Sequence, residues 1–95
     1  MLIQRLIFQV QPPEFSKDYL KADSEVWNPW LQRQPGFLKK DTTYTANGQV
    51  TITNFWRSAE DFNQMVLKQD ELAKVGKMME NRSPGTARLI TSMRN

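Results

Sequence analysis

The sequence contains no cysteine and no histidine among its 95 residues. Without cysteine it has no disulfide and no thiolate nucleophile, and nothing in it points to an oxidising compartment. Without histidine it lacks the commonest general base, the commonest metal ligand and the usual axial ligand of haem iron. A histidine-dependent hydrolase triad and a structural zinc site are therefore excluded, and the sequence predicts no metal site.

Long apolar runs are also missing. The N-terminal segment MLIQRLIFQVQ is apolar but is interrupted by Gln4, Arg5 and Gln9. It has neither a basic leading region nor a cleavage site of small residues, so it is not a signal peptide. No run approaches the roughly 20 apolar residues of a membrane span. We expect a cytoplasmic protein that does not interact with membranes.

Clustered positive charge is equally scarce. The net charge is +3, from 13 Lys and Arg against 10 Asp and Glu, and Lys39-Lys40 is the only adjacent basic pair. Nucleic-acid-binding proteins carry a basic patch or stripe. The sequence therefore predicts that the protein does not bind nucleic acid.

What the chain does have is a large aromatic content, with three Trp, two Tyr and five Phe. A chain of this length forms one domain, residues 1–95, and has only a thin core of its own. Either helices cover a sheet efficiently, or a second copy of the chain shares the burial of these side chains.

The first half of the chain is predicted to contain a strand and a helix. Alternation of apolar and polar residues over Leu2–Gln11 indicates a strand. After Pro12-Pro13 an amphipathic helix is expected from spacings of three and four residues. Its apolar stripe consists of Phe15, Tyr19, Ala22, Val26 and Trp30. Pro29 lies inside this pattern, so the helix should either kink at Asn28 or stop and restart there.

A hairpin is predicted in the middle of the chain. Gln34-Pro35-Gly36-Phe37 has the residues of a type II turn, and Asn47-Gly48 is the dipeptide preferred in two-residue type I′ loops. The strands are expected at about residues 37–46 and 49–57. A two-residue loop pairs Thr45 with Val50, Thr43 with Ile52, Asp41 with Asn54 and Lys39 with Trp56.

The last third is predicted to contain helix and strand. Ser58 followed by Glu60 and Asp61 is typical of a helix N-terminus. Helical periodicity continues to about Glu80, and the polar stretch 68–70 together with Gly76 indicates a break into two helices. A strand is expected from Thr86 to Arg94. Its two faces would carry Ala87, Leu89, Thr91 and Met93 on one side, and Arg88, Ile90 and Ser92 on the other.

This order, β-α-β-β-α-(α)-β, predicts a ferredoxin-like α+β fold: an antiparallel sheet with helices on one face. The other face would still expose Ile3, Ile7 and part of the hairpin. An open apolar face of that size usually has a partner. We therefore expect a homodimer that closes this face through a two-fold isologous interface.

Two stretches carry a resemblance to a known family. The segment SEVWNPWLQRQPGFLKKDTTY, followed by VTITNFWRSAEDF, resembles the dimeric α/β-barrel group that includes the antibiotic-biosynthesis monooxygenase (ABM) type domains. The matching features are a Trp late in the first helix, the turn at Pro35-Gly36, a strand ending in Trp56, and Ser58 opening the second helix. The likeness is greatest to an uncharacterised branch of stand-alone proteins and extends over nearly the whole chain.

The resemblance implies a cofactor-independent monooxygenase that acts on a small, quinol-like aromatic substrate without a metal or bound cofactor. In the oxygenases that this sequence resembles, an Asn and a Trp near the cavity act on substrate and oxygen. The resemblance therefore makes Asn54 and Trp56 the candidate catalytic residues. The candidate pocket-lining residues are Trp27, Asp41, Lys39, Tyr44 and Met65. The haem-degrading members need a helix histidine that this chain lacks. The alternative functions are a non-catalytic ligand-binding or stress-associated homodimer, and a purely structural interaction module.

Each candidate also has an ordinary structural interpretation. Asn54 and Trp56 share one strand face, so both can be packing residues of the sheet. Met65 fits a helix residue facing the core, and Tyr44 fits a solvated sheet residue. Trp27 and Trp30 are expected first to pack between helix and sheet, with Trp27 at the mouth of a pocket as a second role.

Overall fold

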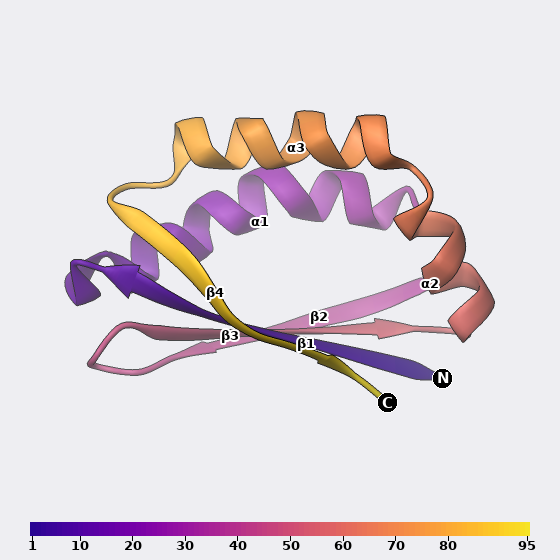
Figure 1. Ribbon diagram of the computed structural model, residues 1–95, viewed down its shortest axis with the longest axis horizontal. Coiled ribbons are helices and arrows are strands. Elements are labelled where there is room, and N and C mark those ends of the chain that lie inside the picture. Colours follow the sequence, from indigo (N-terminus) through magenta and orange to yellow (C-terminus); the bar gives the residue numbers. More distant parts are fainter.

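One antiparallel sheet and a layer of helices on one of its faces make up the fold (Figure 1). The computed structural model describes residues 1–95. Its strands are β1 (Leu2–Gln11), β2 (Phe37–Tyr44), β3 (Gln49–Trp56) and β4 (Thr86–Arg94), in the sheet order β2-β3-β1-β4. The helices are a short 3₁₀ turn, η1 (Pro13–Phe15), and α1 (Ser16–Gln32), α2 (Ala59–Val66) and α3 (Gln69–Arg82). The predicted ferredoxin-like α+β fold is confirmed.

The core lies between α1 and the inner face of the sheet. Alternate strand residues point to this face, which is the reason that the strands read as alternating sequences. The buried apolar side chains include Leu2, Val10, Val50, Ile52 and Trp56 from the sheet and Tyr19, Ala22, Val26, Trp30 and Leu31 from α1. The helical stripe predicted from spacing is therefore the face that α1 buries.

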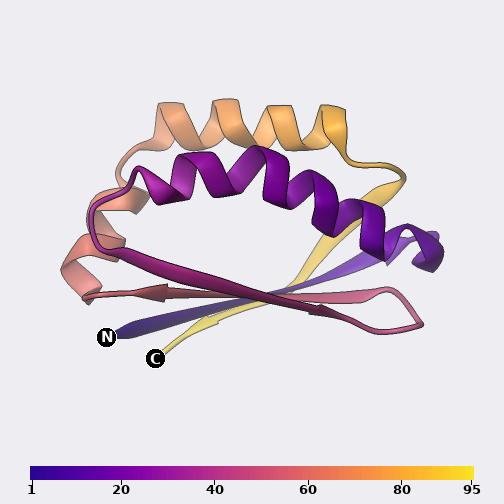
Figure 2. The same cartoon turned by 180° about the vertical axis from the view of Figure 1, so that it is seen from behind.

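Helix α1 is one continuous helix (Figure 2), and Pro29 lies inside it. The predicted stop and restart at Asn28 is wrong. Proline removes a backbone donor and usually disrupts a helix, but here buried side chains on both sides of it, Val26 and Trp30, keep the helix on the sheet. The guanidinium of Arg33 also donates to the Pro29 carbonyl at 3.1 Å.

The hairpin register differs from the prediction by one residue. The Gly48 amide donates to the Thr45 carbonyl at 3.1 Å, so Ala46 and Asn47 are the central residues of the turn. Gly48 has φ +92°, whereas Asn47 does not have the positive φ that a type I′ turn requires. Strand β2 therefore ends at Tyr44, which pairs with Val50, and Lys40 rather than Asp41 lies opposite Asn54.

A bulge alters the faces of β4. Ile7 pairs with Thr91 while Phe8 pairs with Leu89, so Ile90 has no partner of its own. The predicted grouping of residues 87, 89, 91 and 93 on one face is wrong for this reason, because a bulge shifts the alternation by one residue. Leu89 lies on the helix side with Phe8, and Thr91 on the outer side with Ile7.

The helix predictions after β3 are confirmed in part. The Asp61 amide donates to Ser58 Oγ at 3.1 Å, so Ser58 is the N-cap of α2 as expected. The helical segment is interrupted at residues 67–68, between α2 and α3. Gly76 lies within α3, so the prediction that it contributes to the interruption is wrong. Helix α3 packs on α1 and lies farther from the sheet than α1 does (Figure 1). None of the helices combines the length and hydropathy needed to cross a membrane.

Candidate functional site

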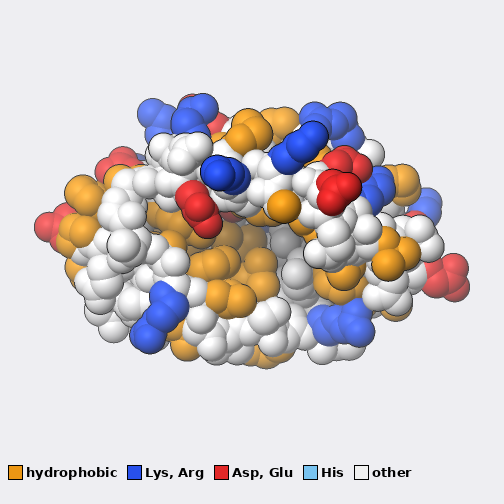
Figure 3. All heavy atoms as spheres, turned by 45° about the horizontal axis from the view of Figure 1, so that its top comes forward, with side chains coloured by type: hydrophobic (Ala, Val, Ile, Leu, Met, Phe, Trp, Pro, Cys, Tyr) orange, Lys and Arg blue, Asp and Glu red, His pale blue; other side chains and the backbone are white.

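A cavity of about 170 Å³ lies between the helices and the inner face of the sheet. Its aromatic lining is Phe8, Tyr19, Trp27 and Trp30, its aliphatic lining is Leu6, Leu31, Ile52, Met65 and Leu72, and its polar lining is Gln4, Asp23, Lys40 and Asn54. The space-filling view shows a hollow lined with hydrophobic side chains and charged side chains around its rim (Figure 3). An apolar cavity with a few converging polar groups is the usual form of a small-molecule site.

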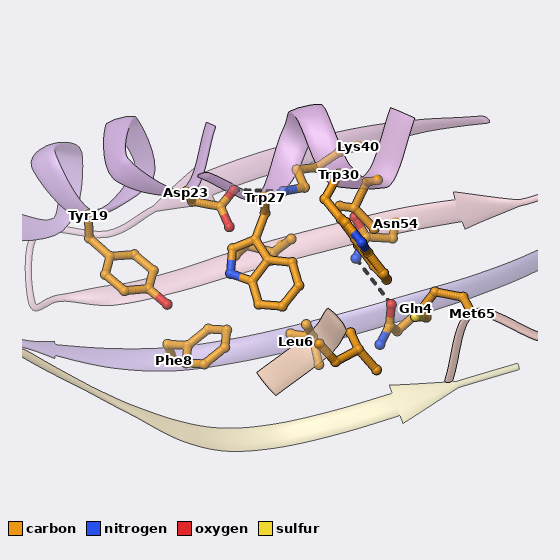
Figure 4. Close-up of a pocket in the computed structure, with 13 residues that line it drawn as sticks. Gln4, Leu6, Phe8, Tyr19, Asp23, Trp27, Trp30, Lys40, Asn54 and Met65 are labelled. Atoms are coloured by element: carbon orange, nitrogen blue, oxygen red, sulfur yellow. Dashed lines mark hydrogen bonds and ion pairs between the residues drawn. The ribbon is translucent and has the colours of Figure 1, made fainter. Parts of the chain in front are cut away.

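Asn54 supplies a polar group from the middle of the sheet. Its side chain amide donates to Gln4 Oε1 at 3.1 Å, across the pair of strands β3 and β1 (Figure 4). The residue is only 5% exposed, and its Oδ1 is buried without a hydrogen-bond partner. Asn54 thus lines the cavity, and its Oδ1 has no hydrogen-bond partner in the protein, although buried polar groups are normally paired.

A buried ion pair forms another part of the wall. Lys40 Nζ lies 2.8 Å from Asp23 Oδ2, and the two side chains are 7% and 5% exposed. Figure 4 shows this pair above the cavity, joining β2 to α1. Buried charges are retained only when they are paired, because desolvation of a lone charge is costly.

Tyr19 lies next to this pair on α1. Burial, and then the negative charge of Asp23, raise the pKa of Tyr19 to about 12. Its ring packs against Phe8 at a centroid distance of 5.8 Å. Tyr19 therefore contributes an un-ionised phenol and an aromatic surface at neutral pH.

The two tryptophans of α1 differ in their surroundings. Trp30 is 3% exposed, and its indole N–H donates to Glu71 Oε1 of α3 at 3.0 Å. Trp27 is half-buried and meets Trp30 edge to face, with centroids 6.1 Å apart. In Figure 4 the Trp27 indole points from α1 towards the sheet, between Tyr19 and Phe8 on one side and Trp30 and Asn54 on the other.

The structure brings only some of the candidate residues together. Asn54, Trp27 and Met65 line the cavity. Trp56 is fully buried on the same strand face as Asn54 but does not line the cavity, because Phe37 and Phe62 enclose its ring at 5.3 and 5.8 Å.

The other three candidates lie elsewhere, and for Lys39 and Asp41 the one-residue error in the register is the reason. Lys39 and Asp41 lie on the outer face of the sheet, 3.7 Å apart, with side chains 63% and 60% exposed. Tyr44 is exposed at the end of β2. A shift of one residue moves each strand side chain to the opposite face, so Lys40 takes the inner position that had been assigned to Asp41.

Sequence reasoning missed Asp23, Lys40 and Gln4. A signal for Asp23 was present, because it follows Tyr19 by four residues and precedes Val26 by three, so it falls within the buried stripe of α1. A charge in an apolar stripe predicts a buried partner. Lys40 could not be found without the correct hairpin register. No three side chains of Asp or Glu lie close enough together to hold a metal ion.

Comparison with known proteins gives a likeness of fold. No protein-family model matches the sequence, and no curated protein matches it. A monooxygenase from the gene ActVA-Orf6 of Streptomyces coelicolor, in complex with Nanaomycin D, has a similar structure: 18% identity, TM-score 0.71, with 95% of this chain and 85% of that chain covered. A dimeric ferredoxin-like protein from an uncultured marine organism gives 13% identity and a TM-score of 0.75, covering 100% and 92%.

A third similar structure is a mutant of SnoaB, a cofactor-independent oxygenase from Streptomyces nogalater. It gives 15% identity and a TM-score of 0.64, with 95% of this chain and 90% of that chain covered. Other similar structures are described as putative antibiotic-biosynthesis monooxygenases. The resemblance to ABM-type proteins is thus confirmed at the level of the fold.

Proposed function

We propose that the protein is a cofactor-independent monooxygenase that acts on a small hydroxylated aromatic compound of the hydroquinone type. The observation that carries the proposal is the Asn54 Oδ1, buried without a partner in the wall of an aromatic-lined cavity. Leaving a buried acceptor unpaired is unfavourable, and a substrate hydroxyl that donates to it removes this penalty. Two of the similar structures are described as a monooxygenase and a cofactor-independent oxygenase.

The proposed reaction balances without a further reductant. Hydroquinone and dioxygen give hydroxyquinone and water: a ring C–H bond and both O–H bonds break, a C–O bond forms, and the O–O bond breaks. One oxygen atom enters the ring and the other leaves in water. The substrate supplies every electron that reduces dioxygen.

The residues of the cavity have distinct roles in this proposal. Asn54 accepts a hydrogen bond from one substrate hydroxyl and so orients the ring. The ammonium of Lys40 stabilises the substrate phenolate, which is the form that donates electrons to dioxygen. The carboxylate of Asp23, which pairs with Lys40, accepts the proton of the substrate hydroxyl. Trp30 and Phe8 supply aromatic surface for the substrate ring. Trp56, which the resemblance made a catalytic candidate, acts here as support for β3.

The test is oxygen consumption with hydroquinone in buffer containing a chelator, corrected for spontaneous oxidation. Mass spectrometry after reaction under isotopically labelled dioxygen shows whether one oxygen atom enters the product. Asn54→Ala should lower kcat/KM by roughly tenfold to a hundredfold, the range for one hydrogen bond to an ionising group. Asn81→Ala, at an exposed position of α3, is the matched control and should keep full activity.

A second candidate function is binding of such an aromatic ligand without turnover. The observation in its favour is that the only carboxylate lining the cavity, Asp23, already pairs with Lys40. Saturable binding that Asn54→Ala weakens, with no oxygen consumption above background, would support this alternative. Oxygen consumption equal in wild type and Asn54→Ala would contradict the proposed site.

We also infer a homodimer formed through the outer face of the sheet. Ile3 and Ile7 of β1 and Phe55 of β3 are half-buried on this face, which no helix covers. One similar structure is described as a dimeric ferredoxin-like protein. A two-fold pairing of outer faces would bury this surface and leave the cavities on the two outer sides of the dimer.

A further inference from the structure

A groove next to the cavity is not used by the proposed reaction. It has a volume of about 420 Å³ and runs beneath the C-terminal half of α3 towards the start of β4. Its lining includes Gly76 and Met79 of α3 and Ala87 of β4. Phe8, Tyr19 and Trp27 line the groove and the cavity alike, so these two spaces share a wall.

The cavity itself is the size of one ring. A dry apolar cavity of about 150 Å³ binds benzene, and the cavity beside Asn54 measures about 170 Å³. A chain attached to a single ring has to leave the cavity, and the groove, which shares Phe8, Tyr19 and Trp27 with it, is the adjoining space.

Gly76 leaves space in the groove that packing does not require. A Cβ atom built at this position meets no heavy atom within 4 Å, and the residue has no positive φ. Glycine inside a helix is destabilising relative to alanine. Neither close packing nor backbone conformation therefore requires glycine at this position, which borders the groove.

We propose that the substrate is a single-ring hydroquinone or phenol that carries a linear alkyl chain, with the ring beside Asn54 and the chain in the groove under Gly76. This inference rests on the proposed site at Asn54, but it concerns binding and does not depend on turnover. The groove is lined mainly by carbon at Phe8, Trp27, Met79 and Ala87, which suits a hydrocarbon chain. Trp27 is half-buried and lines both spaces, so it lies where the ring joins the chain.

The experiment is calorimetric titration of the full-length protein with phenol and with phenols carrying progressively longer 4-alkyl chains, below their micelle concentrations. Each methylene buried in the groove should raise the affinity roughly threefold to fourfold. Gly76→Leu fills the groove and should remove at least about tenfold of the gain given by the longest chain, with little change for phenol. Lys77→Leu places the same side chain on the exposed side of α3 and should keep the full gain.

Folding of the variants is checked by thermal melts, in which Gly76→Leu should be at least as stable as wild type because leucine favours helix. The proposal is overturned if alkylphenols bind no more tightly than phenol, if neither binds, or if Gly76→Leu weakens phenol and alkylphenols equally. Chain-dependent binding without oxygen consumption would keep this inference and reject the oxygenase. Turnover of hydroquinone that does not depend on an alkyl chain would support the oxygenase and reject this inference.

Discussion

The carboxylate of Asp23 accepts a hydrogen bond from the ammonium of Lys40 at 2.8 Å, with both side chains almost completely buried. Asp23 belongs to α1 and Lys40 to the edge strand β2. The pair therefore ties the edge of the sheet to the helix that covers it. It also places side by side the only two charged side chains that line the cavity.

Breaking this pair should destabilise the fold. Asp23→Asn or Lys40→Met leaves one buried charge without its partner, and we expect each to lower the free energy of unfolding by about 3–5 kcal/mol in urea melts. Glu25→Gln on the same helix is the matched control, because Glu25 pairs with Arg82 at 3.0 Å in a half-exposed position. Such a pair contributes at most about 1 kcal/mol.

The double variant Asp23→Leu with Lys40→Met should recover most of the loss, because it removes both charges and fills the space with carbon. Single variants as stable as Glu25→Gln would show that water reaches the Asp23–Lys40 pair and would contradict its burial.

The raised pKa of Tyr19 predicts a loss of stability in alkali. The folded state holds the phenol proton up to about pH 12, whereas the unfolded chain releases it near the ordinary value of 10.0. Between these values the unfolded state binds fewer protons, so the free energy of unfolding falls as pH rises, by about 2–3 kcal/mol in total. Below pH 10 this contribution is fully present.

The titration is measured by the ultraviolet absorbance of tyrosinate in Tyr44→Phe, in which Tyr19 is the only remaining tyrosine. Adding Asp23→Asn should lower the pKa of Tyr19, because the neighbouring negative charge is removed. A Tyr19 that titrates at its ordinary value in Tyr44→Phe would contradict its burial in the cavity wall.

The sequence predicted the fold well because the fold depends on local signals. The alternation in β1, the stripe of α1 and the cap at Ser58 each fixed one element, and their order left few topologies. The site was predicted less well because it depends on register. Asn-Gly favours a type I′ loop, but in this hairpin only Gly48 has a positive φ. The register is therefore shifted by one residue, and Lys40 takes the place beside Asn54 that was predicted for Asp41.

The position of Trp56 shows a further limit of sequence reasoning. Its place two residues after Asn54 correctly put both on the inner face of the sheet. Whether a residue on that face meets a cavity or other side chains depends on α2 and on the turn before β2, which bring Phe62 and Phe37 against Trp56. No spacing within β3 contains that information.

Trp30 should be the more important tryptophan of α1 for stability. Because Trp30 is buried and also bonds to Glu71, Trp30→Ala should lower the free energy of unfolding by about 3–5 kcal/mol. Trp27→Ala should lower it by less, since Trp27 is half-buried at the cavity. A loss below about 1 kcal/mol for Trp30→Ala in denaturant melts would refute the packing role.

The proposed dimer can be tested at the centre of the outer face of the sheet. Ile7 lies between Thr51 of β3 and Thr91 of β4 on that face, so a charge there would be buried in a face-to-face dimer. We expect wild type to be a dimer in native mass spectrometry at micromolar concentration, and Ile7→Glu to raise the dissociation constant at least about a hundredfold, because an unpaired buried charge is costly.

Leu67→Glu is the control: Leu67 is 70% exposed and lies between α2 and α3, away from this face, so the substitution should leave the dimer intact. A monomeric wild type, or a dimer that Leu67→Glu disrupts and Ile7→Glu does not, would place the interface elsewhere or remove it. A retained mass on the wild-type protein in the same spectrum would bear on the cavity, and a hydroxylated aromatic compound with an alkyl chain is the ligand expected there.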